Sequence, residues 1–278
     1  MTSGLDVTTR VPSVLASEAA VSLGRREIWR DVSLSIQAGS FAVVLGPNGS
    51  GKTTLLRALL GLQELSAGRL TVLGERPGVR RGQIGYVPQH AGFDASVRVR
   101  GIDVVRLGLD GARWGIPLPG RRSRAAWARV KEVISLVEAT AYAKRPIGQL
   151  SGGEQQRLII AQALAKGPNL LLLDEPLDNL DISNQAIVAA LIQRICRERG
   201  ISVVMVAHDV NPILPYIDQV IYLAGGSAVS GTPEEVITSE TLSALYGTRV
   251  EVLRSSDGRL VVVGQPEPPA IHTERHDR

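Results

Sequence analysis

The sequence predicts an α/β fold with a helical insertion. Short, continuously apolar runs alternate with helix-like segments along most of the 278 residues. Apolar runs of this length suit parallel strands covered on both faces, and their alternation with helices is typical of an α/β domain. The stretch from about 90 to 165 differs, because it contains helix-like pieces and loops without a clear strand. We therefore expect a parallel-sheet core with a helical subdomain inserted into it.

Each expected element follows from a local pattern. The expected strands are 40–46, 84–89, 170–176, 201–209 and 219–226, and the expected helices are 51–61, 126–139, 153–166 and 183–199. Inside the insertion, the arginine-rich segment 108–131 indicates a loop. The segment 249–264 predicts a β-hairpin, because two β-rich runs flank the turn pair Asp257–Gly258. The polar, proline-rich residues 265–278 predict a disordered tail.

Composition and charge exclude several classes of protein. Hydrophobic residues make up 44% and charged residues 21%, which is ordinary for a globular protein. No window approaches the roughly 18 consecutive apolar residues of a membrane span, and the first residues lack the regions of a signal peptide. The formal net charge of +4 is too small to indicate a nucleic-acid partner. The single cysteine, Cys196, excludes a disulfide within the chain.

Residues 46–53, GPNGSGKT, fit the phosphate-binding pattern G-x-x-x-x-G-K-[ST]. The match follows an expected strand and opens an expected helix, which is the context that the pattern requires. Inward-pointing N–H groups and the helix N-terminus both favour a phosphate there. We expect Lys52 to reach the β- and γ-phosphates of a nucleotide, Thr53 to bind Mg²⁺ and Thr54 to reach the α-phosphate. The expected binding loop is Gly46, Pro47, Asn48, Gly49, Ser50, Gly51, Lys52, Thr53 and Thr54.

Two adjacent acids, Asp174 and Glu175, end the apolar run LLLLDEP. Ligands of open α/β sheets gather at the carboxyl ends of strands, where the phosphate-binding loop is also expected. Neighbouring residues on a strand point to opposite sides, so the two acids should have different roles. By analogy with other phosphate-loop enzymes, we expect Asp174 to face Mg²⁺ through water. Glu175 should project toward the γ-phosphate and orient or deprotonate the attacking water.

Two further polar residues end expected strands. His208 ends the run SVVMVAHD, where it is placed to hydrogen-bond the γ-phosphate. Gln89 ends IGYVPQ, and its amide oxygen is a candidate ligand for Mg²⁺ or for the attacking water. Gln89 also lies at the junction with the helical insertion. Together with Lys52 and Glu175, these two residues form the expected catalytic set.

The segment LSGGEQQR, residues 150–157, offers a second site for a phosphate. Ser151 and Glu154 form the S-x-x-E pattern of a capping box, which predicts a helix start. Gly152 and Gly153 weaken that helix by about 1 kcal/mol each relative to alanine, but they leave its first N–H groups accessible. The residues alone leave two interpretations open, a phosphate contact and a flexible helix start without a ligand.

Taken together, these motifs resemble the ATP-binding subunit of ABC transporters. GPNGSGKTT, Gln89, LSGGEQQR, LLLLDEP, LDNLD and His208 follow in the order and approximate spacing of that family. The resemblance covers residues 14–245 and implies a single domain: a P-loop NTPase core, an antiparallel β part near the N-terminus and a helical subdomain at about 90–165. Residues 246–264 then form a C-terminal hairpin extension.

The resemblance implies cofactors, partners and a location. ATP with Mg²⁺ would lie between two head-to-tail subunits of a homodimer. The phosphate-binding loop of one subunit would face Ser151, Gly152 and Gly153 of the other, and Asp181 of LDNLD would join the two sites. The partners implied are an integral membrane permease and, indirectly, an extracytoplasmic solute-binding protein, with no nucleic acid. The subunit would lie peripherally on the cytoplasmic face of the cell membrane.

Finer features are similar to the ATPases of zinc and manganese importers. These features are the segment 84–109, the variant LDEPLDNLD and the segment 207–223. ATPases of iron-chelate importers are close relatives and stay open as an alternative. Two other classes fit less well: a nucleotide-binding regulator that does not hydrolyse ATP, and a soluble ABC ATPase acting on DNA or ribosomes. Lys52, Glu175, Gln89 and His208 argue against the first, and the modest charge and lone nucleotide domain argue against the second.

One position departs from the family pattern. Aligning residues 20–36 places Leu23 where an aromatic side chain usually stacks on adenine. Leucine offers apolar contact without stacking, so we expect weaker or less base-selective adenine binding. Trp29 is close in sequence but falls at a position that is usually an aliphatic core residue.

Overall fold

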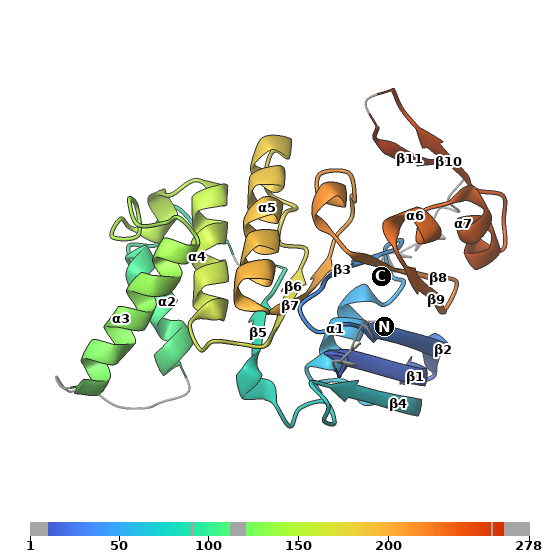
Figure 1. Cartoon of the computed structure of the whole chain (residues 1–278), viewed down its shortest axis with the longest axis horizontal. Coiled ribbons are helices and arrows are strands. Elements are labelled where there is room, and N and C mark those ends of the chain that lie inside the picture. Colours follow the sequence, from blue (N-terminus) through green and yellow to red (C-terminus); the bar gives the residue numbers. More distant parts are fainter. Residues whose placement is uncertain (1–10, 90–91, 112–120, 257, 264–278) are drawn as a thin grey trace, which may run out of the picture.

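The computed structural model describes residues 11–89, 92–111, 121–256 and 258–263 (Figure 1). The strands are β1 (Val14–Leu23), β2 (Arg26–Ile36), β3 (Phe41–Leu45), β4 (Ala67–Val72), β5 (Ile84–Val87), β6 (Leu170–Asp174), β7 (Ser202–Val206), β8 (Gln219–Ala224), β9 (Ser227–Gly231), β10 (Glu251–Arg254) and β11 (Leu260–Val263). The α-helices are α1 (Lys52–Leu59), α2 (Gly101–Asp110), α3 (Arg121–Leu136), α4 (Gly152–Leu164), α5 (Ile182–Arg199), α6 (Pro233–Val236) and α7 (Ser239–Tyr246). Short 3₁₀ turns lie at Arg81–Gln83, Ile147–Gln149 and Leu214–Tyr216.

The central sheet has the strand order β5-β6-β7-β3-β8-β9. Neighbouring strands are parallel, except that β9 adds antiparallel to β8 at one edge. The parallel register places Asp174 of β6 beside Val206 of β7, so these two strands end at the same level. The carboxyl ends of β3, β5, β6 and β7 thus share one edge of the sheet. The predicted α/β class is confirmed, and every predicted site residue from these strands lies at that edge.

Both faces of this sheet are buried, which explains the uninterrupted apolar runs. On β7, Val203 and Met205 face a core formed with helices α2 to α5. Val204 and Val206 face the opposite core, which includes α1 and the N-terminal strands. The strand pleat assigns alternate residues to the two cores, so the whole run from 203 to 206 is apolar.

A separate antiparallel sheet of β2, β1 and β4 covers one side of the core and confirms the predicted antiparallel part. Its buried face includes Trp29 and Ile36, which pack in the same core as Leu55 and Leu56 of α1. Figure 1 shows this sheet beside α1 and well away from the helical subdomain. The N-terminal sheet and α1 therefore form the support for the loop that connects β3 to α1.

The helical subdomain contains α2, α3 and α4, and it corrects the loop predicted at 108–131. Helix α2 runs to Asp110 and α3 begins at Arg121, with 112–120 outside the described residues. Apolar residues at helical spacing, Val130, Val133 and Ile134, are buried in the core. Arginine is a good helix former, so its abundance did not indicate a loop.

Two arginines, Arg106 of α2 and Arg129 of α3, make contacts between the helices of this subdomain. The Arg106 guanidinium lies 4.4 Å from the ring centroid of Trp127 and pairs with Asp110 at 2.9 Å. Arg129 donates hydrogen bonds to the carbonyl oxygens of Leu164 and Ala165 at the end of α4. The arginines thus join α2, α3 and α4. No helix among the described residues has the length and apolar character needed to cross a membrane.

The described part of the chain ends in α6, α7 and the β10–β11 hairpin. The hairpin pairs Val252 with Val262 and Leu253 with Val261, with Gly258 in the turn. Val250 and Leu260 are buried against the main core, so the hairpin packs on the domain. Asp257 and the predicted disordered tail at 265–278 lie outside the described residues.

Candidate active site

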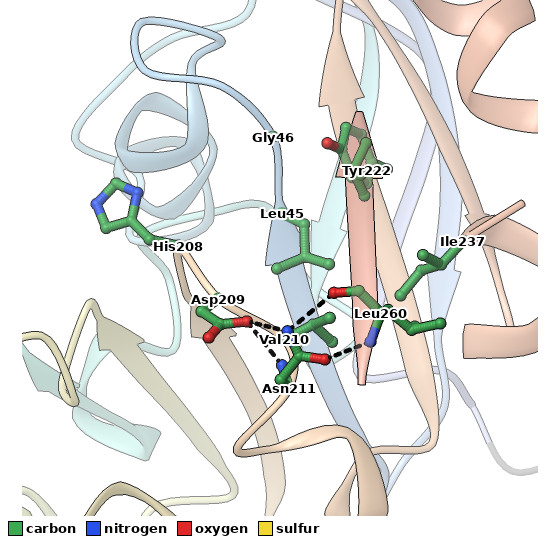
Figure 2. A pocket seen from close by; sticks show the side chains of 10 residues that line it. Leu45, Gly46, His208, Asp209, Val210, Asn211, Tyr222, Ile237 and Leu260 are labelled. Atoms are coloured by element: carbon green, nitrogen blue, oxygen red, sulfur yellow. Dashed lines mark hydrogen bonds between the residues drawn. The ribbon is translucent and has the colours of Figure 1, made fainter. Parts of the chain in front are cut away.

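The loop between β3 and α1 has the backbone that its glycines predict. Gly46, Gly49 and Gly51 have φ values of 142°, 78° and 95°. Residues other than glycine rarely adopt this backbone conformation. A Cβ on Gly46 would lie 2.0 Å from the carbonyl oxygen of Leu223, and one on Gly51 would lie 2.5 Å from Ile28. Gly46 and His208 also line a cavity of about 220 Å³ (Figure 2). Steric contact and backbone conformation therefore both require glycine in this loop.

Lys52 is the first residue of α1 and is buried, with 5% of its surface exposed. Its Nζ donates hydrogen bonds to the carbonyl oxygens of Gly46 at 2.8 Å and Pro47 at 3.1 Å. Burial lowers the pKa of the Lys52 ammonium, while the charges of Glu175 and Asp174 act in the opposite direction. The ammonium is held within the loop by carbonyl oxygens, on the helix end that favours anions.

Asp174 ends β6 and is buried, and its Oδ1 accepts a hydrogen bond from Thr53 Oγ1 at 3.3 Å. Burial raises the pKa of Asp174, and the neighbouring Glu175 raises it further, while the Thr53 hydrogen bond lowers it. Burial and the charge of Asp174 likewise raise the pKa of Tyr86, on strand β5. The structure thus joins Thr53 and Asp174 into a pair of oxygen ligands of the kind that Mg²⁺ prefers.

Glu175 is the first residue beyond β6 and has a φ of 52°. It is 7% exposed, and its side chain accepts a short hydrogen bond from the Gln89 amide. Asp174 and Glu175 do contact different groups, as predicted, but the reason differs. The left-handed turn at Glu175 separates them, since the strand pleat has already ended there.

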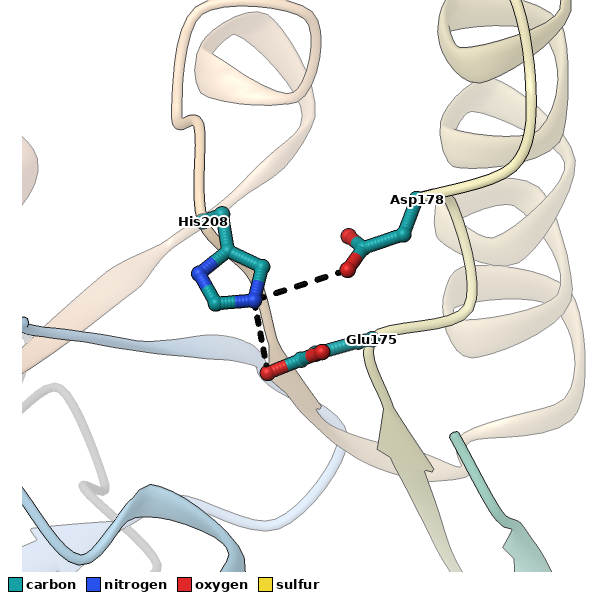
Figure 3. A group of neighbouring side chains, drawn as sticks. All are labelled: Glu175, Asp178 and His208. Atoms are coloured by element: carbon teal, nitrogen blue, oxygen red, sulfur yellow. Dashed lines mark ion pairs between the residues drawn. The ribbon is translucent and has the colours of Figure 1, made fainter. Parts of the chain in front are cut away.

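His208 lies two residues beyond the end of β7 and completes the cluster around Glu175 (Figure 3). Its Nε2 is 2.8 Å from Glu175 Oε1 and 3.5 Å from Asp178 Oδ2. Gln89 likewise lies two residues beyond β5. The strands predicted to end at Gln89 and His208 therefore end earlier, and short loops present both side chains to Glu175.

Sequence reasoning missed Asp178 and Tyr86. Asp178 follows Glu175 in a tight turn that returns its carboxylate to the same side. Burial raises the pKa of Asp178, and so does its hydrogen bond with Glu175. The acid-rich run LDEPLDNLD was the available signal for Asp178. Tyr86 carried no such signal, because its proximity to Asp174 depends on β5 pairing with β6.

The second glycine segment forms the predicted capping box. Glu154 N donates to Ser151 Oγ at 3.3 Å, and Ser151 N donates to Glu154 Oε2 at 2.8 Å. Ser151 and Gly152 are exposed, while Gly153 is buried. Figure 1 places α4 in the helical subdomain, separated from α1 by α5 and the sheet. The structure therefore does not bring this segment to the phosphate-binding loop of the same chain.

Asp181 links this helix start to the Glu175 turn. Its side chain caps α5 by accepting hydrogen bonds from Asn184 N at 2.9 Å and Asn184 Nδ2 at 2.6 Å. The Asn184 side chain in turn faces Gly153, where an added Cβ would lie 3.1 Å from its Oδ1. One turn, 175–181, thus connects the Glu175 cluster to the exposed start of α4.

Leu23 and Trp29 occupy different environments on the N-terminal sheet. Leu23 ends β1 and is 44% exposed, so it presents an apolar surface to solvent. Trp29 is 1% exposed and lies directly beneath Gly51, where an added Cβ would be 2.7 Å from its Cδ1. Trp29 is a core residue that supports the loop and offers no exposed ring for stacking.

Comparison with known proteins finds relatives of this chain. A family model described as ABC transporter matches residues 29–178. A zinc import ATP-binding protein, ZnuC, of Cereibacter sphaeroides is 39% identical over 84% of this chain and 88% of its own length. A manganese transport system ATP-binding protein, MntB, of Listeria innocua is 35% identical over 78% of this chain and 89% of its own length.

Solved structures share the fold. The dimeric ATP-binding cassette MJ0796, in a post-hydrolysis state with ADP and Pi bound, has a TM-score of 0.64 at 27% identity. That likeness covers 79% of this chain and 98% of the other. The structure of cbiO1 from Clostridium perfringens has a TM-score of 0.72 at 23% identity. This match covers 84% of this chain and 94% of the other, and it supports the fold alone.

Proposed function

Since the chain belongs to the ABC transporter family, we propose that it is the ATP-hydrolysing subunit of a metal-ion importer. The observation that carries the proposal is the convergence of Gln89, Asp178 and His208 on Glu175, at the sheet edge that also holds Lys52. The names of the zinc and manganese relatives support a metal ion as the transported solute. We also propose that the subunit lies peripherally on the cytoplasmic face of the cell membrane, where ATP is available to an importer.

The residues fit ATP with Mg²⁺. The glycine loop at 46–51 and the start of α1 suit the phosphates. Lys52 is held in this loop by its hydrogen bond to the carbonyl oxygen of Gly46. Thr53, Asp174 and the Gln89 amide oxygen would hold Mg²⁺, with Asp174 acting through water. When bound, the ion would neutralise charge on the β- and γ-phosphates.

Glu175 is the group placed to act on the attacking water. Its two carboxylate oxygens are held by different partners, Oε2 by the Gln89 amide and Oε1 by His208. This fixed orientation allows the carboxylate to position a water and to accept its proton. His208 would then hydrogen-bond the γ-phosphate from the neighbouring loop.

A second copy of the chain would complete the site. Ser151 and Gly152, at the start of α4, are exposed, and α4 lies apart from α1 of its own subunit (Figure 1). In a head-to-tail homodimer, these residues would contact the γ-phosphate held by Lys52 of the other subunit. The turn that ends at Asp181 would link the two sites. The dimeric arrangement of MJ0796 supports this proposal.

A groove between the sheet and the helical subdomain suits a permease segment. It has a volume of about 450 Å³ and lies between β5 and α4, with Tyr86, Pro88 and Phe93 among its lining residues. The backbone N of Phe93 donates a hydrogen bond to Gln155 Oε1 of α4 at 2.9 Å, which holds Phe93 in place. Pro88 adjoins Gln89, so an occupant of this groove would contact the segment that holds Glu175. A solute-binding protein would act on the permease from the other side of the membrane.

A substitution in this groove tests the coupling to a permease. Gly92 lines the groove, and a Cβ there would meet nothing within 4 Å. Gly92→Trp should fill the groove, leave ATP hydrolysis by the isolated chain unchanged and abolish metal uptake by proteoliposomes that contain the permease. The readout is ATP-dependent uptake of Zn²⁺, Mn²⁺ and a ferric chelate.

The matched control is Gly82→Trp. Gly82 also has open space around it, but it lies outside the groove. Normal uptake with Gly92→Trp, or equal loss with Gly82→Trp, would reject this docking site. Uptake of the ferric chelate in place of Zn²⁺ and Mn²⁺ would reject the metal-ion assignment.

A further inference from the structure

The loop after β7 is attached at two ends. At one end, His208 contacts Glu175 and Asp178 in the active site. At the other end, three residues later, Asn211 is attached to β11 of the C-terminal hairpin. The histidine side chain itself is 41% exposed, so packing alone does not hold it. The position of His208 therefore depends on how its loop is fastened.

The Asn211 side chain hydrogen-bonds to both backbone groups of Leu260 in the hairpin, as the backbone of a neighbouring strand would (Figure 2). Its Oδ1 accepts from Leu260 N at 2.7 Å, and its Nδ2 donates to the Leu260 carbonyl oxygen at 3.1 Å. Asp209 orients the Asn211 amide, because its Oδ1 accepts from both Asn211 N at 2.9 Å and Nδ2 at 2.8 Å. The side chain thus satisfies both backbone groups of Leu260, a fit that needs one donor and one acceptor on the same amide.

The hairpin is a firm anchor for this loop. Ser243 of α7 accepts a hydrogen bond from Val250 N at 2.9 Å and donates to Val250 O at 3.1 Å. Ser239, also on α7, accepts from Val252 N at 2.8 Å. Val250 and Leu260 are buried, with 1% and 8% of their surface exposed. Packing and hydrogen bonds therefore fix the hairpin through its first strand, β10, which pairs with the strand that binds Asn211, β11.

We propose that Asn211 is a positioning residue for ATP hydrolysis, through which the C-terminal hairpin holds the His208 loop in register with Glu175. The proposal rests on the hydrolysis proposed above and gives strands β10 and β11 a role in the reaction. Asn211 itself touches no substrate. Its effect is on where His208 lies, so its loss should lower turnover and leave nucleotide affinity intact.

The first test is steady-state kinetics of the full chain with Mg-ATP. Asn211→Ala should lower kcat by about 10- to 100-fold, since small misplacements of catalytic groups are costly. The KM for ATP should stay within about twofold, because the phosphate-binding loop is untouched. The matched control is Val261→Ser, which changes the exposed face of the same hairpin, and it should retain wild-type kcat.

The second test observes His208 directly and needs neither hydrolysis nor a permease. In protein labelled with ¹³C at histidine Cε1, the His208 signal is assigned by its loss in His208→Gln. That signal should shift or broaden in Asn211→Ala and stay unchanged in Val261→Ser. If wild-type protein did not hydrolyse ATP, this measurement would still decide the positioning role.

Thermal unfolding separates misfolding from misplacement. If Asn211→Ala does not fold, Asn211→Asp replaces it, since it keeps the acceptor for Leu260 N and loses the donor to Leu260 O. Its kcat should then lie between those of the wild type and of His208→Gln. A folded variant with wild-type kcat, or an unmoved His208 signal, would overturn the proposal.

Discussion

Single residues in the active site have conflicting demands for stability and for function. Asp174 is buried beside another acid, and its raised pKa shows that the fold disfavours its charged form. Burial lowers the pKa of Lys52, so the fold disfavours its charged form as well. Buried charges of this kind cost stability and cluster at functional sites. The pattern supports a site arranged for a charged ligand.

Replacing Asp174 by asparagine should make the protein more stable and inactive. A neutral amide removes the buried charge and retains an oxygen for Thr53, so the Tm should rise by about 2–4 °C for each kcal/mol recovered. Because the folded-state pKa is raised, the wild type regains this stability as the pH falls through that pKa, and the difference in Tm should narrow in acid. Scanning calorimetry without nucleotide measures both effects. A lower Tm for the variant at neutral pH would contradict the prediction.

Leu23 makes a separate prediction at the edge of the N-terminal sheet. Its exposed side chain ends β1, and the sequence predicts that it takes the place of an adenine-stacking aromatic. Leu23→Tyr should tighten ATP binding, since an aromatic ring adds about 1 kcal/mol of stacking on a base. Equilibrium titration with ATP and GTP measures the change. Unchanged affinity for both nucleotides would place the base elsewhere.

Among the elements, helix α4 has an unusual start. A capping box closes it in the usual way, yet the next two residues are glycines whose added Cβ atoms would approach Leu180 and Asn184. The glycines therefore let the helix start pack close to the turn at 175–181 and leave its N–H groups accessible. A larger side chain there would disturb both the turn and any ligand at the helix end.

A mixed dimer tests whether this element serves the other subunit. Ser151→Arg should abolish hydrolysis although the phosphate-binding loop of that variant is intact. Lys52→Ala should also abolish hydrolysis, because it changes the phosphate-binding loop itself. Mixing the two variants should restore activity, because one of the two sites in each mixed dimer then has both halves intact. ATPase assays of co-purified, differently tagged subunits provide the measurement. Absence of recovery in the mixture would refute the shared site.

At the scale of the whole molecule, the two halves of the proposed site lie apart. Lys52 begins α1, directly after the loop that follows β3, and Glu175 and His208 meet just beyond the ends of β6 and β7. Helix α4 lies in the helical subdomain, on the far side of α5 (Figure 1). The fold therefore favours closure by a second subunit, with ATP as part of the interface.

Glu175→Gln should trap that closed assembly. The amide keeps the shape of the side chain but cannot accept a proton from water, so hydrolysis should fall by at least about 100-fold while ATP binding remains. Size-exclusion chromatography with Mg-ATP should show a dimer for the variant and a weaker, transient one for the wild type. A variant that turns over ATP normally and elutes as a monomer would rule out this role for Glu175.

The sequence by itself determined the parts of this protein that short patterns encode. Three glycines and a lysine at fixed spacing require the turn between β3 and α1, and Ser151 with Glu154 sets the start of α4. Apolar runs predicted the doubly covered sheet, because successive apolar residues of β3, β6, β7 and β8 alternate between the two cores. Such features depend on neighbours within one turn or one strand, so residue order is sufficient to predict them.

Only the tertiary structure decided which side chains meet. Tyr86 lies near Asp174, and His208 contacts Glu175, because strands far apart in sequence are neighbours in the sheet. Arg129 belongs to helix α3, where it reaches the carbonyl oxygens at the end of α4, and Trp127 of the same helix receives Arg106 of α2. Asn211 reaches Leu260 only because the hairpin folds back on the domain. These contacts depend on strand order and long-range packing, which no local pattern records.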